Sequence, residues 1–252
     1  MLKLLILAVV AVSIQAEDYC AIQSQSCRGR EHIACEPNSF KTPSDVRNIQ
    51  VVQMTDDIRN SLVSGHNAYR SKTAKGEEPK IPSASKMEKM FWDDELEYVA
   101  HQHVKHGSFA HDQCRATADY PYSGQNLAVG YSSVPYSDVA AVIRSHVDMW
   151  YNKEMAIVRD QMPSCIDSFT QSPNCLSAGH YTVMISQTND HVGCGAVTFE
   201  KNMSGRWWYA VMTTCNYAYT NMGNEKLYDK GSTCSACSSI GKTCESSSGL
   251  CV

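Results

Sequence analysis

The chain has 252 residues, and its 22 Lys and Arg against 26 Asp and Glu give a formal net charge of −4. This mildly acidic balance argues against a nucleic-acid partner, because such partners select basic surfaces. Nothing in the composition indicates disorder. The length allows one substantial core with a small appendage.

The first residues have the layout of a secretory signal: Lys3, an apolar run over residues 4–12, and a short polar stretch that ends at Ala16. We therefore predict a signal peptide over 1–16 and a mature chain from Glu17. The apolar run is about nine residues long, whereas a bilayer span needs roughly 20, and no later segment is continuously apolar. An extracellular protein without a membrane anchor is expected.

All twelve cysteines follow the predicted signal, at 20, 27, 35, 114, 165, 175, 194, 215, 234, 237, 244 and 251. An even number in an exported chain favours six disulfides. Zinc binding by Cys234, Cys237, Cys244 and Cys251 is the alternative. The one Asn-x-Ser/Thr sequon is Asn202-Met203-Ser204, so Asn202 is a candidate for glycosylation.

Three helices are predicted in the first half, after an irregular, cysteine-bearing arm over residues 17–54. The first follows capping candidates at Thr55 to Asp57, and the second opens at Asp93 and Asp94 beyond a loop over 75–85. In each predicted helix, apolar and histidine residues recur at helical spacing. The first helix has Ile58, Leu62, His66 and Tyr69, and the second has Leu96, Val99, His103 and His106. The third helix is predicted from Val139, Val142, Ile143, His146, Val147 and Trp150.

The second half has the composition of strands. Residues 181–186, 194–199 and 207–214 are expected to be strands, with a hairpin turn at Asn202 to Gly205. Helices followed by antiparallel strands predict an α+β layered domain. The Ser-, Gly- and Cys-rich tail over 231–252 is too small for a core and should depend on two disulfides.

Four motifs then occur in order: HNAYR at 66–70, GQNLA at 124–128, GHYT at 179–182 and CNY at 215–217. Together they resemble the CAP superfamily of cysteine-rich secretory, antigen five and pathogenesis-related proteins. FWDDEL at 91–96 and FAHDQC at 109–114 resemble its arthropod antigen five branch, including salivary horsefly proteins of the tabinhibitin and tablysin group. The resemblance implies an α-β-α sandwich with an antiparallel sheet over residues 55–222.

The resemblance also implies disulfides. By similarity to venom antigen five proteins, Cys20 should pair with Cys35, Cys27 with Cys114, and Cys194 with Cys215. Cys165 and Cys175 are then expected to close a local loop. The four tail cysteines allow three pairings that remain open.

CAP proteins resemble one another in a cleft where two histidines and two acidic residues can hold a divalent cation. His111 and His180 match the histidines, but Gln125 stands where one carboxylate is expected, and the other position falls on Lys153. Glu154 is one residue further, rotated by about 100° on a helix, and is expected to face elsewhere. We therefore expect no cofactor, with a divalent cation at His111 and His180 as the alternative.

The same comparison suggests two binding sites. Arg28-Gly29-Arg30-Glu31 lies where some horsefly relatives present Arg-Gly-Asp to platelet integrins, with Arg30 in place of the aspartate and Glu31 displaced by about 3.5 Å. Val142, Ile143, His146 and Trp150 form a helix face with one polar group, which suits a small lipid such as a leukotriene. The ordinary alternatives are a basic loop and a helix face in the core.

Catalysis is not expected, because neither a Gly-x-Ser-x-Gly nor a His-Glu-x-x-His motif occurs. His103 and His106 share a helix face and are expected to be structural. The resemblance implies a monomeric, secreted, salivary, non-enzymatic protein that interferes with host haemostasis through a platelet integrin or a lipid mediator. The alternatives are an allergen bound only by IgE and a cation-dependent CAP hydrolase.

Overall fold

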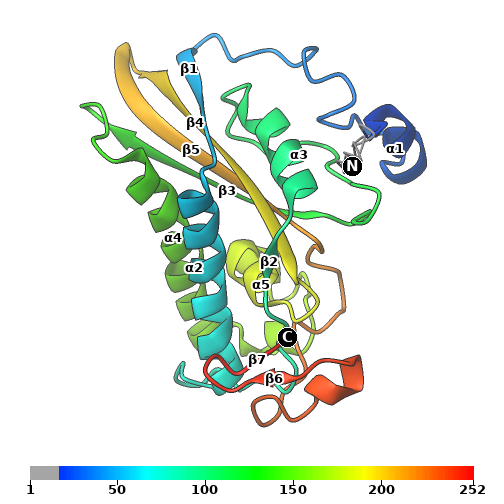
Figure 1. The fold of residues 1–252 in the computed structure, drawn as a ribbon. Helices are drawn as coiled ribbons and strands as arrows, with labels where there is room; N and C mark the ends of the chain where they lie inside the picture. Colours follow the sequence, from blue (N-terminus) through cyan, green and yellow to red (C-terminus); the bar gives the residue numbers. More distant parts are fainter. Residues whose placement is uncertain (1–16) are drawn as a thin grey trace, which may run out of the picture.

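The structure, a computed structural model, describes residues 17–252; the predicted signal peptide over 1–16 lies outside the described residues. Figure 1 shows five α-helices, of which the sequence predicted α2, α3 and α4 but not α1 or α5. Their bounds are α1 (Tyr19–Ser26), α2 (Asp56–Lys75), α3 (Asp94–Val104), α4 (Val139–Gln161) and α5 (Gly179–Ile185), with short 3₁₀ turns at Pro163–Ile166, Cys175–Ala178 and Cys237–Ile240. The strands are β1 (Val46–Val52), β2 (Phe91–Trp92), β3 (Gly124–Ser132), β4 (His191–Met203), β5 (Arg206–Tyr217), β6 (Cys244–Glu245) and β7 (Leu250–Cys251).

One antiparallel sheet forms the middle layer, with its strands in the order β1-β4-β5-β3, and the short β2 pairs with β4 in parallel. Helices α2, α4 and α5 cover one face of the sheet and α3 covers the other (Figure 1). The larger core cluster lies on the α2 and α4 side, and a smaller one around Val104 and Met212 lies on the α3 side. The predicted α-β-α sandwich is confirmed.

The first two predicted helices begin where their capping signals place them, and the third begins at Val139, after a cap at Asp138 that the sequence analysis did not identify. The side chains of Thr55, Asp93 and Asp138 each accept a hydrogen bond from a backbone N–H of the first turn of α2, α3 and α4. Helix α2 ends at Gly76, whose φ of 67° is the left-handed conformation that suits glycine at a helix end. Helix α3 ends at Val104, so His106 lies beyond it and not on a face shared with His103.

The prediction of a strand over residues 181–186 is wrong. Residues 181–185 belong to α5, which packs against α4 and α2, and Ser186 is the residue that caps its C-terminal end. Tyr181 through Ile185 are all buried. A short helix buried on every side shows no helical period, and its Tyr, Thr and Val content then resembles that of a strand. Tertiary packing therefore overrides the local preference.

The arm over residues 17–54 is more regular than predicted. It contains α1, capped by Asp18, and β1, which is hydrogen-bonded along β4 as an edge strand of the main sheet. The register of β1 shifts between Arg47 and Gln50, and Asn48 has a φ of 55° there. This β-bulge interrupts the alternation of side chains along β1, so the segment shows no regular two-residue period in the sequence.

The hairpin predicted at Asn202 to Gly205 joins β4 to β5 through a two-residue turn. Ser204 (φ 53°) and Gly205 (φ 82°) both have the positive φ that a type I′ turn requires. The turn sets a register in which Asn202 pairs with Trp207 and Cys194 with Cys215.

Six disulfides join all twelve cysteines: Cys20–Cys35, Cys27–Cys114, Cys165–Cys175, Cys194–Cys215, Cys234–Cys244 and Cys237–Cys251. The zinc alternative for the tail is therefore wrong, since its four sulfurs are paired. The tail is also tied to the main domain, because Cys251 exchanges backbone hydrogen bonds with Met87 and Lys89 and because Leu250 joins the main core. Within residues 17–252, no helix is long and apolar enough to cross a bilayer.

Candidate functional site

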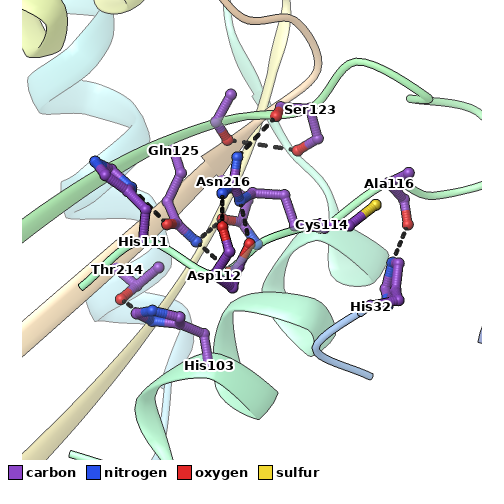
Figure 2. A network of polar contacts seen from close by, with 12 residues as sticks. His32, His103, His111, Asp112, Cys114, Ala116, Ser123, Gln125, Thr214 and Asn216 are labelled. Carbon is purple, nitrogen blue, oxygen red and sulfur yellow. Dashed lines mark hydrogen bonds and ion pairs between the residues drawn. The ribbon is translucent and has the colours of Figure 1, made fainter. Parts of the chain in front are cut away.

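The residues of the cleft expected from the resemblance, here called the cleft, include a hydrogen-bonded chain that starts at His111 (Figure 2). His111 Nδ1 lies 2.7 Å from Gln125 Oε1. Gln125, on β3, donates through Nε2 to Asp112 Oδ2 at 2.7 Å and to Asn216 Oδ1 at 3.1 Å. Asp112 in turn pairs with Arg115 at 2.7 Å, and its side chain is only 2% exposed. The network anchors the loop that carries His111 to strands β3 and β5.

These contacts define which nitrogen of His111 carries the proton. Both hydrogens of the Gln125 amide point to acceptors on Asp112 and Asn216, so its oxygen must face His111. His111 Nδ1 therefore donates, and Nε2 of the neutral ring keeps a free lone pair. Partial loss of hydration around the ring is the main cause that lowers the pKa of His111, which favours this neutral form.

His180, at the start of α5, is oriented in the same way by a different acceptor. Its Nδ1 donates to Glu154 Oε1 at 2.6 Å, and Glu154 Oε2 accepts from the backbone N–H of Tyr181 at 3.0 Å. The ring of His180 stacks on Trp150 with centroids 6.0 Å apart. Because Glu154 contacts Nδ1, it does not occupy Nε2 of His180.

The expectation that Glu154 faces away from His180 is wrong. Glu154 lies four residues after Trp150 on α4, which places both side chains on one helix face, whereas Lys153 is exposed to solvent. Counting three residues from Trp150 led to Lys153, but the helical period favours the fourth. Glu154 is thus a carboxylate that orients His180.

The donor set does not form a closed zinc site. Across residues 17–252, only Cys27, His32 and Cys114 bring three metal-type ligand atoms within 4.8 Å of one another, and the two sulfurs there are joined in a disulfide. The cleft offers two imidazole nitrogens, while Glu154 and Gln125 are engaged in orienting them. A structural zinc site uses four protein ligands, so a cation here would take most of its ligands from water or a partner.

The cleft also lacks a paired nucleophile among the described residues. His111 and His180 contact Gln125 and Glu154, and neither ring has a hydrogen bond to a serine, threonine or cysteine side chain in residues 17–252. Nucleophilic catalysis needs a base within hydrogen-bond reach of its nucleophile. The contacts orient the two histidine rings but do not pair either ring with a nucleophile.

The second candidate, Arg28 to Glu31, forms an exposed tip between α1 and His32. All four residues are exposed, and Arg28 and Gly29 have φ values of 53° and 79°. Nothing lies within 4 Å of the position that a Cβ on Gly29 would take. Disulfides at Cys27 and Cys35 flank the tip on both sides. The structure therefore presents these side chains to solvent on a short, doubly anchored loop.

His32 holds the base of this tip. Its Nε2 donates to the carbonyl of Ala116 at 2.6 Å, its Nδ1 accepts from the backbone N–H of Ala34 at 3.0 Å, and its own N–H donates to Gln23 at 2.6 Å. Figure 2 shows His32 and Cys114 beside the network of the central cleft. Both ring nitrogens are used, and burial lowers the pKa of His32, so this histidine is structural.

The structure brings Val142, Ile143, His146 and Trp150 together, but against the sheet. Ile143, His146 and Trp150 are at most 4% exposed. Trp150 Nε1 donates to the carbonyl of Leu127 at 2.9 Å, and His146 Nδ1 lies 2.9 Å from Thr213 Oγ1. Burial lowers the pKa of His146 to about 4. In this conformation the face fills the core, as the ordinary alternative expects.

His103 and His106, the two histidines expected to share a helix face, are both buried. His103 is buried between Thr214 Oγ1 at 2.9 Å and the carbonyl of Ala110 at 2.8 Å. His106 packs near Phe40 and has a lowered pKa because of burial. Sequence reasoning missed Asp112, Arg115 and Asn216; the Asp-to-Arg spacing of three residues is a weak signal for the first two.

The fold and the cleft define a class: a disulfide-rich α-β-α domain with two oriented histidines. The model of the family described as "CAP: Cysteine-rich secretory protein family" matches residues 63–217. Venom allergen-1 of Aedes albopictus is 30% identical over 236 residues, covering 94% of this chain and 88% of the relative. Venom allergen 5 of Vespula maculifrons is 31% identical over 221 residues, covering 85% and 89%.

Among solved structures, that of NaASP2 with Zn²⁺ aligns with a TM-score of 0.61 and 24% identity, over 84% of this chain and 100% of the other. This likeness is one of fold. Together, the family match and the relatives show that the chain belongs to the CAP family and that its homologues are antigen five and venom allergens.

Proposed function

We propose that this chain is a secreted, non-enzymatic binding protein of the antigen five type, which interferes with host haemostasis by engaging a platelet integrin through Arg28 to Glu31. The observation that carries the proposal is the exposed, doubly anchored tip. A short loop held by disulfides loses little conformational entropy on binding, so its side chains are prepared for a partner.

The chemistry of the tip suits recognition of a protein receptor. Two guanidinium groups and one carboxylate, from Arg28, Arg30 and Glu31, are available within four residues. Integrin recognition needs a carboxylate as a metal ligand, and Glu31 is the only acidic side chain in the tip. Relatives of this chain are named as venom allergens, which is consistent with a protein delivered into a host.

An adhesion assay with αIIbβ3 tests the proposal. Glu31→Gln should abolish inhibition of adhesion, because it removes the carboxylate without changing the loop. Glu36→Gln is the matched control, since Glu36 is also exposed and lies just beyond Cys35. Equal inhibition by the wild-type protein and the Glu31→Gln variant would remove this loop as the ligand.

Lipid scavenging at α4 is a second candidate, and it is favoured only by His146, a neutral polar group on an otherwise apolar face. Because that face packs on the sheet, binding would require α4 to move. Recognition by IgE is proposed from the names of the relatives. Restriction of the transcript to salivary tissue would support the host-directed role.

A further inference from the structure

The far end of the β4–β5 hairpin carries the sequon Asn202-Met203-Ser204 beside an aromatic side chain. Asn202 on β4 pairs directly with Trp207 on β5, across the two-residue turn of Ser204 and Gly205. Directly paired residues of an antiparallel ladder project from the same face, with Cβ atoms about 5 Å apart. The side chain of Asn202 is thus next to the ring of Trp207.

The sequon has the exposure and local geometry of a modified site. Ser204 and Gly205 are exposed at the turn, and Asn202 is half-buried. Asn202 Oδ1 accepts a hydrogen bond from the N–H of Gly205 at 3.0 Å. This contact fixes the amide and leaves Nδ2, the atom to which a sugar would be linked, on the opposite side of the group.

Trp207 offers a platform that is held in place from the neighbouring strand. The guanidinium of Arg47 lies 3.8 Å from the ring centroid of Trp207 and also donates twice to Glu200 Oε2, at 2.9 and 2.7 Å. The charge of Arg47 is therefore matched by Glu200, but its guanidinium covers one face of the Trp207 ring, so a sugar would have to stack on the face that Arg47 leaves. An indole face that carries negative partial charge attracts the polarised C–H bonds of a neutral sugar ring.

The same face has room beyond Trp207. Residues of one parity share a face of a strand, so Glu200 and Thr198 follow Asn202 along β4 at about 7 Å per pair of residues. Glu200, Thr198 and Tyr209 line a hollow of about 260 Å³, together with Asn48, Gln50 and Tyr136. Amide, hydroxyl and carboxylate groups beside tyrosine rings suit a polyhydroxylated ligand.

We propose that Asn202 carries an N-linked glycan whose first N-acetylglucosamine stacks on Trp207. In the transfer, Asn202 Nδ2 forms a bond to the anomeric carbon of an oligosaccharide supplied on a lipid pyrophosphate. The carbon–oxygen bond to the pyrophosphate breaks, the lipid pyrophosphate leaves with the electron pair, and Nδ2 loses a proton. The inference rests on the export that the proposed function requires.

Intact mass of the full chain secreted from insect cells tests the modification. The wild-type protein should exceed its polypeptide mass by a glycan, and Asn202→Gln and Ser204→Ala should both lose this excess. Ser204→Thr should keep it, because threonine preserves the hydroxyl group of the sequon. A wild-type protein of bare polypeptide mass would overturn the inference, while its secretion and its Glu31-dependent activity would leave the proposed function intact.

Thermal unfolding tests the stacking. Removing the glycan by Asn202→Gln should lower the melting temperature by about 2 °C in a chain with Trp207, and by less when Trp207→Ala is also present. Trp208→Ala is the matched control: Trp208 lies on the opposite face of β5 beneath Arg206 and should leave the glycan effect unchanged.

Trp207→Phe keeps an aromatic face, so Asn202→Gln should still lower the melting temperature in this variant. This variant therefore tests the stacking even if Trp207→Ala fails to fold. An equal loss of melting temperature in all four backgrounds would show that the sugar does not stack on Trp207.

Discussion

The central cleft and the N-terminal tip are built on opposite principles. In the cleft, each polar side chain is oriented by another: Gln125 and Glu154 hold the two histidines, and Asp112 and Asn216 hold Gln125. At the tip, Arg28, Gly29, Arg30 and Glu31 are exposed, and only the base is fastened, by His32 and two disulfides. Internal satisfaction makes the cleft rigid, whereas the tip keeps its charged groups for a partner.

The largest effect is expected when the covalent link between the tip and the cleft is removed. The Cys27–Cys114 bridge spans 87 residues and joins the tip to the cleft loop. Cys27→Ser with Cys114→Ser should lower the free energy of unfolding by about 4.5 kcal/mol, because the unfolded chain regains its freedom.

Urea unfolding of this double variant gives the measurement. The control is Cys234→Ser with Cys244→Ser, which opens a bridge spanning only 10 residues and should cost about 2.5 kcal/mol. Equal losses in the two double variants would contradict an origin in loop closure.

Weakening the centre of the cleft network is the next test. Asp112→Asn removes a 2% exposed carboxylate that pairs with Arg115 and accepts from Gln125. The loss should be about 3 kcal/mol in the free energy of unfolding, since one partner of a buried ion pair remains unmatched.

Asp160→Asn is the matched control, because Asp160 pairs with Arg159 at the surface, where the two side chains are 44% and 28% exposed. No measurable change is expected there. A comparable loss at Asp160 would mean that the cleft network adds nothing beyond surface pairing.

The smallest effect concerns the orientation of the cleft histidines. Zinc titration by calorimetry tests the alternative of a weak cation site at Nε2 of His111 and His180: any binding there should be abolished by His180→Ala. Glu154→Gln should weaken this binding roughly tenfold, because a carboxylate that accepts from the Nδ1–H of a metal-binding histidine raises its basicity.

Lys153→Gln should leave the zinc affinity unchanged, because Lys153 is exposed on the far side of the helix turn. An equal change in zinc affinity at positions 153 and 154 would show that Glu154 is not the carboxylate that supports His180.

Much of the fold could be predicted because its signals are local. Thr55 and Asp93 cap the first two predicted helices, and two positive-φ residues close the hairpin at Ser204 and Gly205. Less of the candidate site could be predicted from the sequence. His111 and His180 were recognised by resemblance, but the partner of His180 was assigned to the wrong position, since a one-residue offset decides which helix face meets α5.

The sequence by itself determined the CAP family, the even set of cysteines and the starts of three helices, because these depend on residue types and short spacings. Only the tertiary structure decided that residues 179–185 form a helix, that β1 joins the main sheet, and that Glu154 orients His180. It alone placed Trp150 in the core and left Glu31 in solvent. These outcomes depend on contacts between segments far apart in the chain, which no local pattern records.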